Sequence, residues 1–212
     1  MDAVILDIDG TLLQSNDADD ELYLAAVRQV LGGVRLRASW GMYTHVTDTG
    51  ILQEVLCDNA LDATSSVVAS VRECFVASVG RHVAAHGPFK EVPGARAFVQ
   101  SLCDSGTHRV AYATGGWFGS AWLKLSAAGF PLHGVPLASS DDHTERQAIM
   151  LHALRQLDGD FRTITYYGDG KWDEVAARGL GWEFTPVGEK LGGLTKFRPL
   201  PPDYVFGRSG EG

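Results

Sequence analysis

Two aspartates, Asp7 and Asp9, stand two residues apart, directly after the apolar run 4–6 and directly before Gly10 and Thr11. Such an apolar run predicts a buried parallel strand, and open α/β sheets bind their ligands where these strands end. On an extended backbone both side chains point the same way, and Gly10 allows the chain to turn back over them. Crowded carboxylates repel each other unless a cation or a proton lies between them, so the pair predicts a catalytic site. An acidic surface turn is the alternative, because Asp and Gly are common turn residues.

Two more predicted strands end in polar residues. The apolar stretch 111–113 runs into Thr114, and the stretch 165–167 runs into a loop that contains Asp169 and Asp173. Because the carboxyl ends of parallel strands meet at one edge of a sheet, we expect these side chains to converge with the first two aspartates. A single acidic loop is easily structural, whereas agreement among three strand ends favours a functional site.

These strand ends resemble the motifs of the haloacid dehalogenase superfamily. Its first motif, DxDGT, matches residues 7–11, its second matches Thr114, and its fourth, GDxxxD, matches residues 168–173. The resemblance covers most of the predicted sheet. It implies an α/β fold, with a doubly wound parallel sheet as a Rossmann-like core and an inserted α-helical cap domain.

The resemblance also implies roles for individual residues. Asp7 is the expected nucleophile, and Asp9 is the expected acid and base. A magnesium ion is expected on the Asp7 carboxylate, the backbone carbonyl of Asp9 and Asp169, with Asp173 as a supporting partner. Thr114 is expected to donate hydrogen bonds to the phosphoryl group. The other expected phosphate-binding groups lie next to the two strand ends, at Gly10, Thr11 and Gly115.

The third motif of the superfamily is a lysine, and here the sequence departs from the pattern. Residues 139–150 contain no Lys, and Arg146 stands in the corresponding place. An arginine carries the same charge but presents it in a planar fork. Lys124 and Lys171 are the other candidates for this charge, and Lys124 is also a candidate for substrate binding.

The rest of the chain alternates between strand and helix patterns. Strands are predicted over 109–113, 135–138, 163–167 and 182–187, and helices over 21–31, 50–57, 61–85, 94–102, 119–128, 144–157 and 172–177. This alternation predicts a parallel sheet. Residues 14–87 show no strand pattern, so we expect a core of residues 1–13 and 88–212 and a helical cap of residues 14–87. We expect the end, 208–212, to be frayed.

The polar stretch 40–50 is the part of the expected cap that we expect to face the site. His45 and Thr47 are its candidate substrate-binding residues, although either could simply cap the next helix, as could Asp48 or Thr49. Residues 14–88 contain no Lys. The expected cap therefore cannot supply the Schiff-base lysine of the phosphonatase branch of the superfamily.

Composition narrows the class of protein. The formal net charge of −8 argues against nucleic acid or an anionic membrane as a partner. The three cysteines, Cys57, Cys74 and Cys103, have no metal-binding spacing and are expected to be reduced and mostly buried. No signal peptide or membrane-spanning stretch is evident, so we expect a cytoplasmic protein, monomeric or homodimeric.

Together these patterns and the resemblance predict a magnesium-dependent phosphatase of a small phosphorylated metabolite, acting through an aspartyl phosphate. A phosphomutase or phosphotransferase of the same superfamily is one alternative. The other is a catalytically weakened scaffold that binds a phosphorylated ligand, which the absent third-motif lysine favours.

Overall fold

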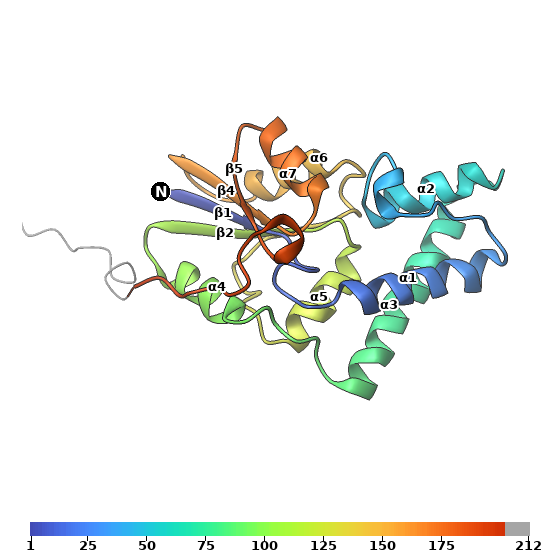
Figure 1. Ribbon diagram of the computed structural model, residues 1–212, viewed down its shortest axis with the longest axis horizontal. Helices are drawn as coiled ribbons and strands as arrows, with labels where there is room; N and C mark the ends of the chain where they lie inside the picture. Colours follow the sequence, from blue (N-terminus) through green and yellow to red (C-terminus); the bar gives the residue numbers. More distant parts are fainter. Residues whose placement is uncertain (202–212) are drawn as a thin grey trace, which may run out of the picture.

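The computed structural model describes residues 1–201 and contains a five-stranded parallel sheet in the order β3-β2-β1-β4-β5 (Figure 1). The strands are β1 (Asp2–Leu6), β2 (His108–Ala113), β3 (Leu137–Ala138), β4 (Thr163–Gly168) and β5 (Glu183–Pro186). Leu6, at the end of β1, lies opposite Tyr112 of β2 and Tyr167 of β4. The three central strands therefore end in step, and the residues that follow them lie side by side.

Four helices cover the two faces of the sheet: α4 (Ala95–Asp104), α5 (Phe118–Ala127), α6 (Arg146–Arg155) and α7 (Lys171–Gly179). Apolar residues of α4 and α5 share one buried cluster with Leu6 and Tyr112. Those of α6 and α7 share a second cluster with Ile5 and Ala111. Because neighbouring residues of a strand point to opposite faces, this division confirms the predicted doubly wound α/β fold.

Three helices separate β1 from α4: α1 (Asn16–Leu31), α2 (Asp48–Asp58) and α3 (Ser65–His86), with the short 3₁₀ helix η1 (Trp40–Met42) between the first two. They lie beyond the carboxyl ends of the strands (Figure 1). Tyr23 of α1 and Phe75 of α3 both pack against Trp117, with ring centroids 5.6 and 5.9 Å from the Trp117 ring. The helical insertion and the sheet thus share one continuous apolar cluster.

Several local expectations need correction. Helix α1 begins at Asn16, five residues before the predicted start, because the acidic residues Asp17 and Asp19 favour the positive end of a helix. Of the candidate caps of α2, the one that caps the helix is Thr47, since its hydroxyl oxygen accepts from the Gly50 N–H at 3.1 Å.

The expectation of mostly buried cysteines is wrong. Cys57 and Cys103 are exposed on their helices, and Cys74 is half-buried at the edge of the main apolar cluster; all three are free thiols. None of the helices within residues 1–201 is long and apolar enough to cross a bilayer. The chain after Val187 passes through the 3₁₀ helix η2 (Glu189–Leu191) and buries Phe197 against Phe98. The end expected to be frayed, 208–212, lies outside the described residues.

Candidate functional site

Asp7 is the first residue after β1 and is only 5% exposed. Its N–H donates to the Tyr167 carbonyl oxygen at 3.0 Å, which continues the ladder between β1 and β4 by one residue. Its Oδ2 accepts a hydrogen bond from the Thr11 hydroxyl at 3.2 Å. The strand and the following turn therefore hold this carboxylate in one orientation at the edge of the sheet.

Arg146, the first residue of α6, supplies a positive charge beside Asp7. Its Nη1 lies 3.5 Å from Oδ1 of Asp7 and 2.9 Å from Oδ1 of Asp173, and its Nη2 donates to the carbonyl oxygen of Val46 at 2.9 Å. Nε and Nη1 are buried and have no hydrogen-bond acceptor among the described residues. The guanidinium thus places its charge beside both carboxylates, and Arg146 also lines the cavity described below.

Gly115 makes room for this guanidinium. A Cβ atom at this position would overlap Nη2 of Arg146 and would lie 3.0 Å from the Val46 carbonyl oxygen. Only a glycine allows the chain after β2 to pass so close to the arginine. Thr114, just before it, is buried, and its hydroxyl oxygen accepts from the Gly116 N–H at 3.0 Å.

Three carboxylates meet at the same edge. Asp7, Asp169 and Asp173 each place one oxygen so that all three lie within 4.8 Å of one another. Burial, with repulsion from Asp173, raises the pKa of Asp7, although Arg146 acts to lower it. Burial, with repulsion from Asp173, also raises the pKa of Asp169, to about 6. Carboxylates under this mutual repulsion favour a divalent cation.

The surroundings of Asp169 and Asp173 differ. Asp169 accepts one hydrogen bond, from the Asn16 amide at 2.8 Å. Both oxygens of Asp173 are occupied, because Oδ1 lies beside Arg146 and Oδ2 accepts from the Gly170 N–H at 3.0 Å. Gly10, which has a positive φ of 76°, keeps space beside Asp169, since a Cβ there would overlap the Asp169 carboxylate.

Asp9 has a different partner, Lys124 of α5. The Lys124 ammonium lies 2.6 and 2.7 Å from the two carboxylate oxygens of Asp9 and 2.7 Å from Oδ1 of Asp19 on α1. Ser15 also donates to Asp9. The ion pairs of Lys124 are therefore with Asp9 and Asp19, and the positive charge beside Asp7 is that of Arg146.

The carboxylates surround a cavity of about 430 Å³ between the sheet edge and the helical insertion. Its walls include Thr114 and Arg146 from the sheet side and Tyr23 and Trp40 from the insertion. Lys171 also lines it but is exposed and pairs with Glu174 at 2.5 Å. Lys124 is not among the lining residues. The cavity is the size of a small-molecule site.

The first residues of α2 are hydrogen-bonded to the loops after β2 and β3. The Asp48 N–H donates to the Gly115 carbonyl oxygen at 2.8 Å, and its Oδ2 accepts from the Trp117 N–H at 2.9 Å. The Thr49 hydroxyl donates to the Ser140 carbonyl oxygen at 2.8 Å. These bonds close the cavity on the side of Thr114.

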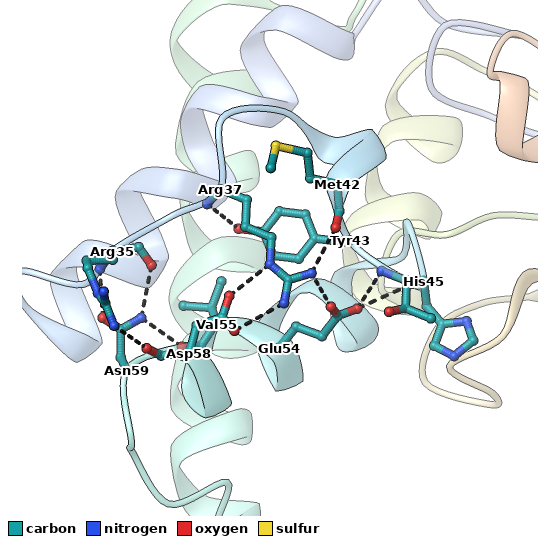
Figure 2. Close-up of polar contacts among 10 residues, drawn as sticks. Arg35, Arg37, Met42, Tyr43, His45, Glu54, Val55, Asp58 and Asn59 are labelled. Carbon is teal, nitrogen blue, oxygen red and sulfur yellow. Dashed lines mark hydrogen bonds and ion pairs between the residues drawn. The ribbon is translucent and has the colours of Figure 1, made fainter.

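His45 and Thr47 lie differently with respect to the cavity. Thr47 is buried, lines the cavity and donates to the Thr144 carbonyl oxygen at 2.8 Å. His45 does not line it. Figure 2 shows the His45 ring turned away from a cluster in which Arg37 pairs with Glu54, while the Glu54 carboxylate accepts the His45 N–H at 3.4 Å. Glu54 thus orders the segment that leads to Thr47.

Sequence reasoning did not identify Asn16, Asp19 and Asp48 as site residues. Asn16 and Asp19 lie in a polar stretch before the predicted helix 21–31, and Asp48 lies in the stretch 40–50 that we expect to face the site but is named there only as a possible helix cap. One available signal was Lys124: it stands among apolar residues of a predicted helix, so its ammonium needs carboxylate partners from elsewhere in the chain.

Comparisons with solved structures show a common fold. A hydrolase from Pseudomonas syringae gives a TM-score of 0.66 at 18% identity and covers 88% of this chain and 84% of its own. CbbY from Rhodobacter sphaeroides, in complex with phosphate, gives 0.63 at 18% identity over 92% and 88%. A β-phosphoglucomutase from Clostridium difficile gives 0.68 at 12% identity over 90% and 86%.

No curated protein matches the sequence significantly. The model of the haloacid dehalogenase-like hydrolase family, in contrast, matches residues 1–181, which include every candidate residue described above. The chain is therefore a haloacid dehalogenase-like hydrolase.

Proposed function

We propose that the protein is a magnesium-dependent phosphatase that hydrolyses a small phosphorylated metabolite through an aspartyl phosphate on Asp7. One observation supports this most: a buried carboxylate at a strand end lies 3.5 Å from a buried arginine, and both residues line the cavity. A carboxylate can attack phosphorus, and a guanidinium fork can bind the phosphoryl oxygens.

In the first step, an oxygen of Asp7 forms a bond to phosphorus while the bond from phosphorus to the ester oxygen breaks. The departing alkoxide takes a proton from the Asp9 carboxyl group and leaves as an alcohol. Arg146 and the hydroxyl of Thr114 hold the phosphoryl oxygens, whose charge must be stabilised as the bonds change.

In the second step, a water molecule attacks the phosphorus of the aspartyl phosphate. Asp9, now a carboxylate, takes the proton of that water, and the bond between phosphorus and the Asp7 oxygen breaks. Inorganic phosphate leaves, and both aspartates return to their starting states. Dividing the displacement in this way replaces one difficult step with two easier ones.

The oxygen donors fit a magnesium ion. Asp7, Asp169 and the backbone carbonyl of Asp9 would hold it, since hard cations prefer oxygen ligands. Asp173 would support Arg146 and the Gly170 turn, because both of its oxygens already have partners. When bound, magnesium neutralises charge on the phosphoryl group and on the carboxylates around it.

We also propose that residues 14–87 act as a cap. The core beneath it would consist of residues 1–13 and of the chain from residue 88 onward. Helices α1–α3 come between two parts of one sheet domain, and residues 47–49 are hydrogen-bonded to the loops after β2 and β3. Such a cap would exclude water from the aspartyl phosphate and select the substrate.

Phosphate release from a panel of phosphorylated metabolites, with and without magnesium, tests the proposal. Release should require magnesium, and Asp7→Asn should lower kcat by on the order of 10³-fold or more. A wild-type protein that binds phosphate esters but hydrolyses none would instead be a scaffold. Isomerised sugar phosphate without phosphate release would identify a mutase.

A further inference from the structure

Lys124 is a fully buried cation outside the cavity. Its side chain enters from α5 and is 0% exposed, although an isolated ammonium is costly to remove from water. All three of its N–H donors have a carboxylate oxygen within 2.7 Å: two on Asp9 and one on Asp19. The geometry therefore pairs the ammonium completely, without any ligand.

This pairing constrains the carboxylate of Asp9. Both of its carboxylate oxygens bond to Lys124, and Ser15 adds a further hydrogen bond. The side chain of Asp9 still lines the cavity and remains 18% exposed. Asp9 thus contacts the buried ammonium and also borders the cavity in which a substrate would lie.

Asp19 connects this arrangement to the helical insertion. It lies in the first turn of α1, whereas Asp9 follows β1 and Lys124 belongs to a helix that packs on the sheet. A single ammonium therefore joins the sheet edge and the insertion. The docking of α1 and the orientation of Asp9 depend on the same group.

We propose that Lys124 is a positioning residue for Asp9, and that Asp19, which lies in the helical insertion, holds the Lys124 ammonium in position. The proposal rests on the proposed function, in which Asp9 is the acid and base. Lys124 touches neither Asp7 nor the phosphoryl site; it acts by fixing the direction of the Asp9 carboxylate. A change at Lys124 should therefore affect proton transfer more than phosphoryl binding.

The dependence of the rate on the leaving group tests this. An alkyl phosphate needs a proton on its departing oxygen, whereas p-nitrophenyl phosphate releases a stable phenolate that needs little assistance. We expect Lys124→Met to lower kcat/KM for an alkyl phosphate on the order of 10²-fold or more, and for p-nitrophenyl phosphate by less than about tenfold. Equal losses with both esters, or no loss with either, would overturn the proposal.

A double variant separates positioning from a general loss of structure. Asp9→Asn should show the same difference between the two esters, and adding Lys124→Met to it should cost little more, because both changes remove one function. A further loss of similar size in the double variant would overturn the proposal. Arg162→Met, which removes an exposed ion pair with Asp2, should leave both rates unchanged.

Asp19→Asn is a second and less disruptive test, which remains available if the Lys124→Met variant does not fold. It keeps the shape and one acceptor oxygen, and we expect a loss of roughly three- to tenfold restricted to the alkyl ester. An equal loss with both esters contradicts the proposal. If the wild-type protein hydrolyses neither ester while Lys124 variants remain folded, the proposed function itself fails, and this inference fails with it.

Discussion

Arg146 donates a hydrogen bond from Nη2 to the carbonyl oxygen of Val46, 2.9 Å away and 100 residues earlier in the chain. The same guanidinium lies 3.5 Å from the carboxylate of Asp7. One side chain thus contacts both the proposed nucleophile and the segment that closes the cavity. A lysine in its place would offer a single ammonium and could not reach both groups in a fork.

The first prediction follows from this double contact. Arg146→Lys should lower kcat by about 10-fold or more, and Arg146→Met by about 10²- to 10³-fold, because the donors to the phosphoryl group are lost. Steady-state kinetics on the best ester in the panel would measure both. A lysine variant as active as the wild type would show that the planar fork is unimportant and that only the charge is needed.

The second prediction concerns the room that Gly115 leaves for the guanidinium. Gly115→Ala would place a methyl group against Nη2 of Arg146 and the Val46 carbonyl oxygen, so the arginine must shift. A shift of about 1 Å at a reacting centre can cost on the order of 10²-fold in rate. Gly106→Ala, where a Cβ meets nothing within 4 Å, is the matched control and should leave kcat/KM unchanged. Equal rates for the two variants would contradict the argument.

The strand ends were predictable because they depend on local pattern. An apolar run followed by Asp7, and a Gly where the chain turns, identify a strand and its exit without any long-range information. The register then follows from parallel pairing, which brings Leu6 opposite Tyr112 and Tyr167. The family match and the observed strand order confirm the predicted family and the predicted doubly wound sheet.

The partners across the cavity were not predictable in the same way. The contact of Lys124 with Asp19 joins residues 105 positions apart, and no local period reports such a pair. The position of Thr47 on the cavity wall, with His45 outside it, depends on how Glu54 holds the preceding turn. The prediction of buried cysteines failed for a related reason, since residue type alone does not tell which face of a helix is buried.

The third prediction concerns pH and magnesium. An aspartate ordinarily has a pKa of 3.8, whereas burial raises the pKa of Asp169 to about 6 and that of Asp19 to about 7. Between about pH 4 and pH 7 the folded protein therefore holds more protons at these groups than the unfolded chain does. Their contribution to the free energy of unfolding falls as pH rises through that window, so the metal-free protein should gain stability on acidification.

Magnesium should oppose this trend, because it binds the deprotonated carboxylates of Asp7 and Asp169. At about 100 times its Kd, magnesium adds about 2.7 kcal/mol at pH 7.5, which corresponds to a rise in Tm of about 5–10 °C. At pH 5 the rise should largely disappear. Thermal unfolding with and without magnesium measures this rise in Tm at each pH. Because each comparison is made at one pH, the effects of pH on surface groups cancel. A rise of equal size at both values, or one that persists in Asp169→Asn, would contradict the metal assignment.

The fourth prediction concerns the charge of the substrate's leaving group. Seven aspartates line the cavity: Asp7, Asp9, Asp17, Asp19, Asp20, Asp48 and Asp169. Against them stand Arg146, Lys171 and Lys190. Burial raises the pKa of Asp48, with repulsion from Asp19 adding to it, and burial raises that of Asp20. The insertion side of the cavity, where a leaving group would lie, contributes four of these aspartates, at positions 17, 19, 20 and 48, and none of the three cations.

Three esters of nearly the same shape test this: 2-aminoethyl phosphate, 2-hydroxyethyl phosphate and phosphoglycolate, which carry a positive, a neutral and a negative end. We expect kcat/KM to fall in that order, by about tenfold or more between the first and the last, since one like-charge contact costs about 1–2 kcal/mol near a protein surface. Asp20→Asn should reduce the spread by removing one charge next to Trp40, to which Asp20 is hydrogen-bonded at 2.7 Å. If phosphoglycolate proves the best of the three, Lys171 and Lys190 must dominate the field in the cavity, and the aspartates of α1 then have a structural role instead.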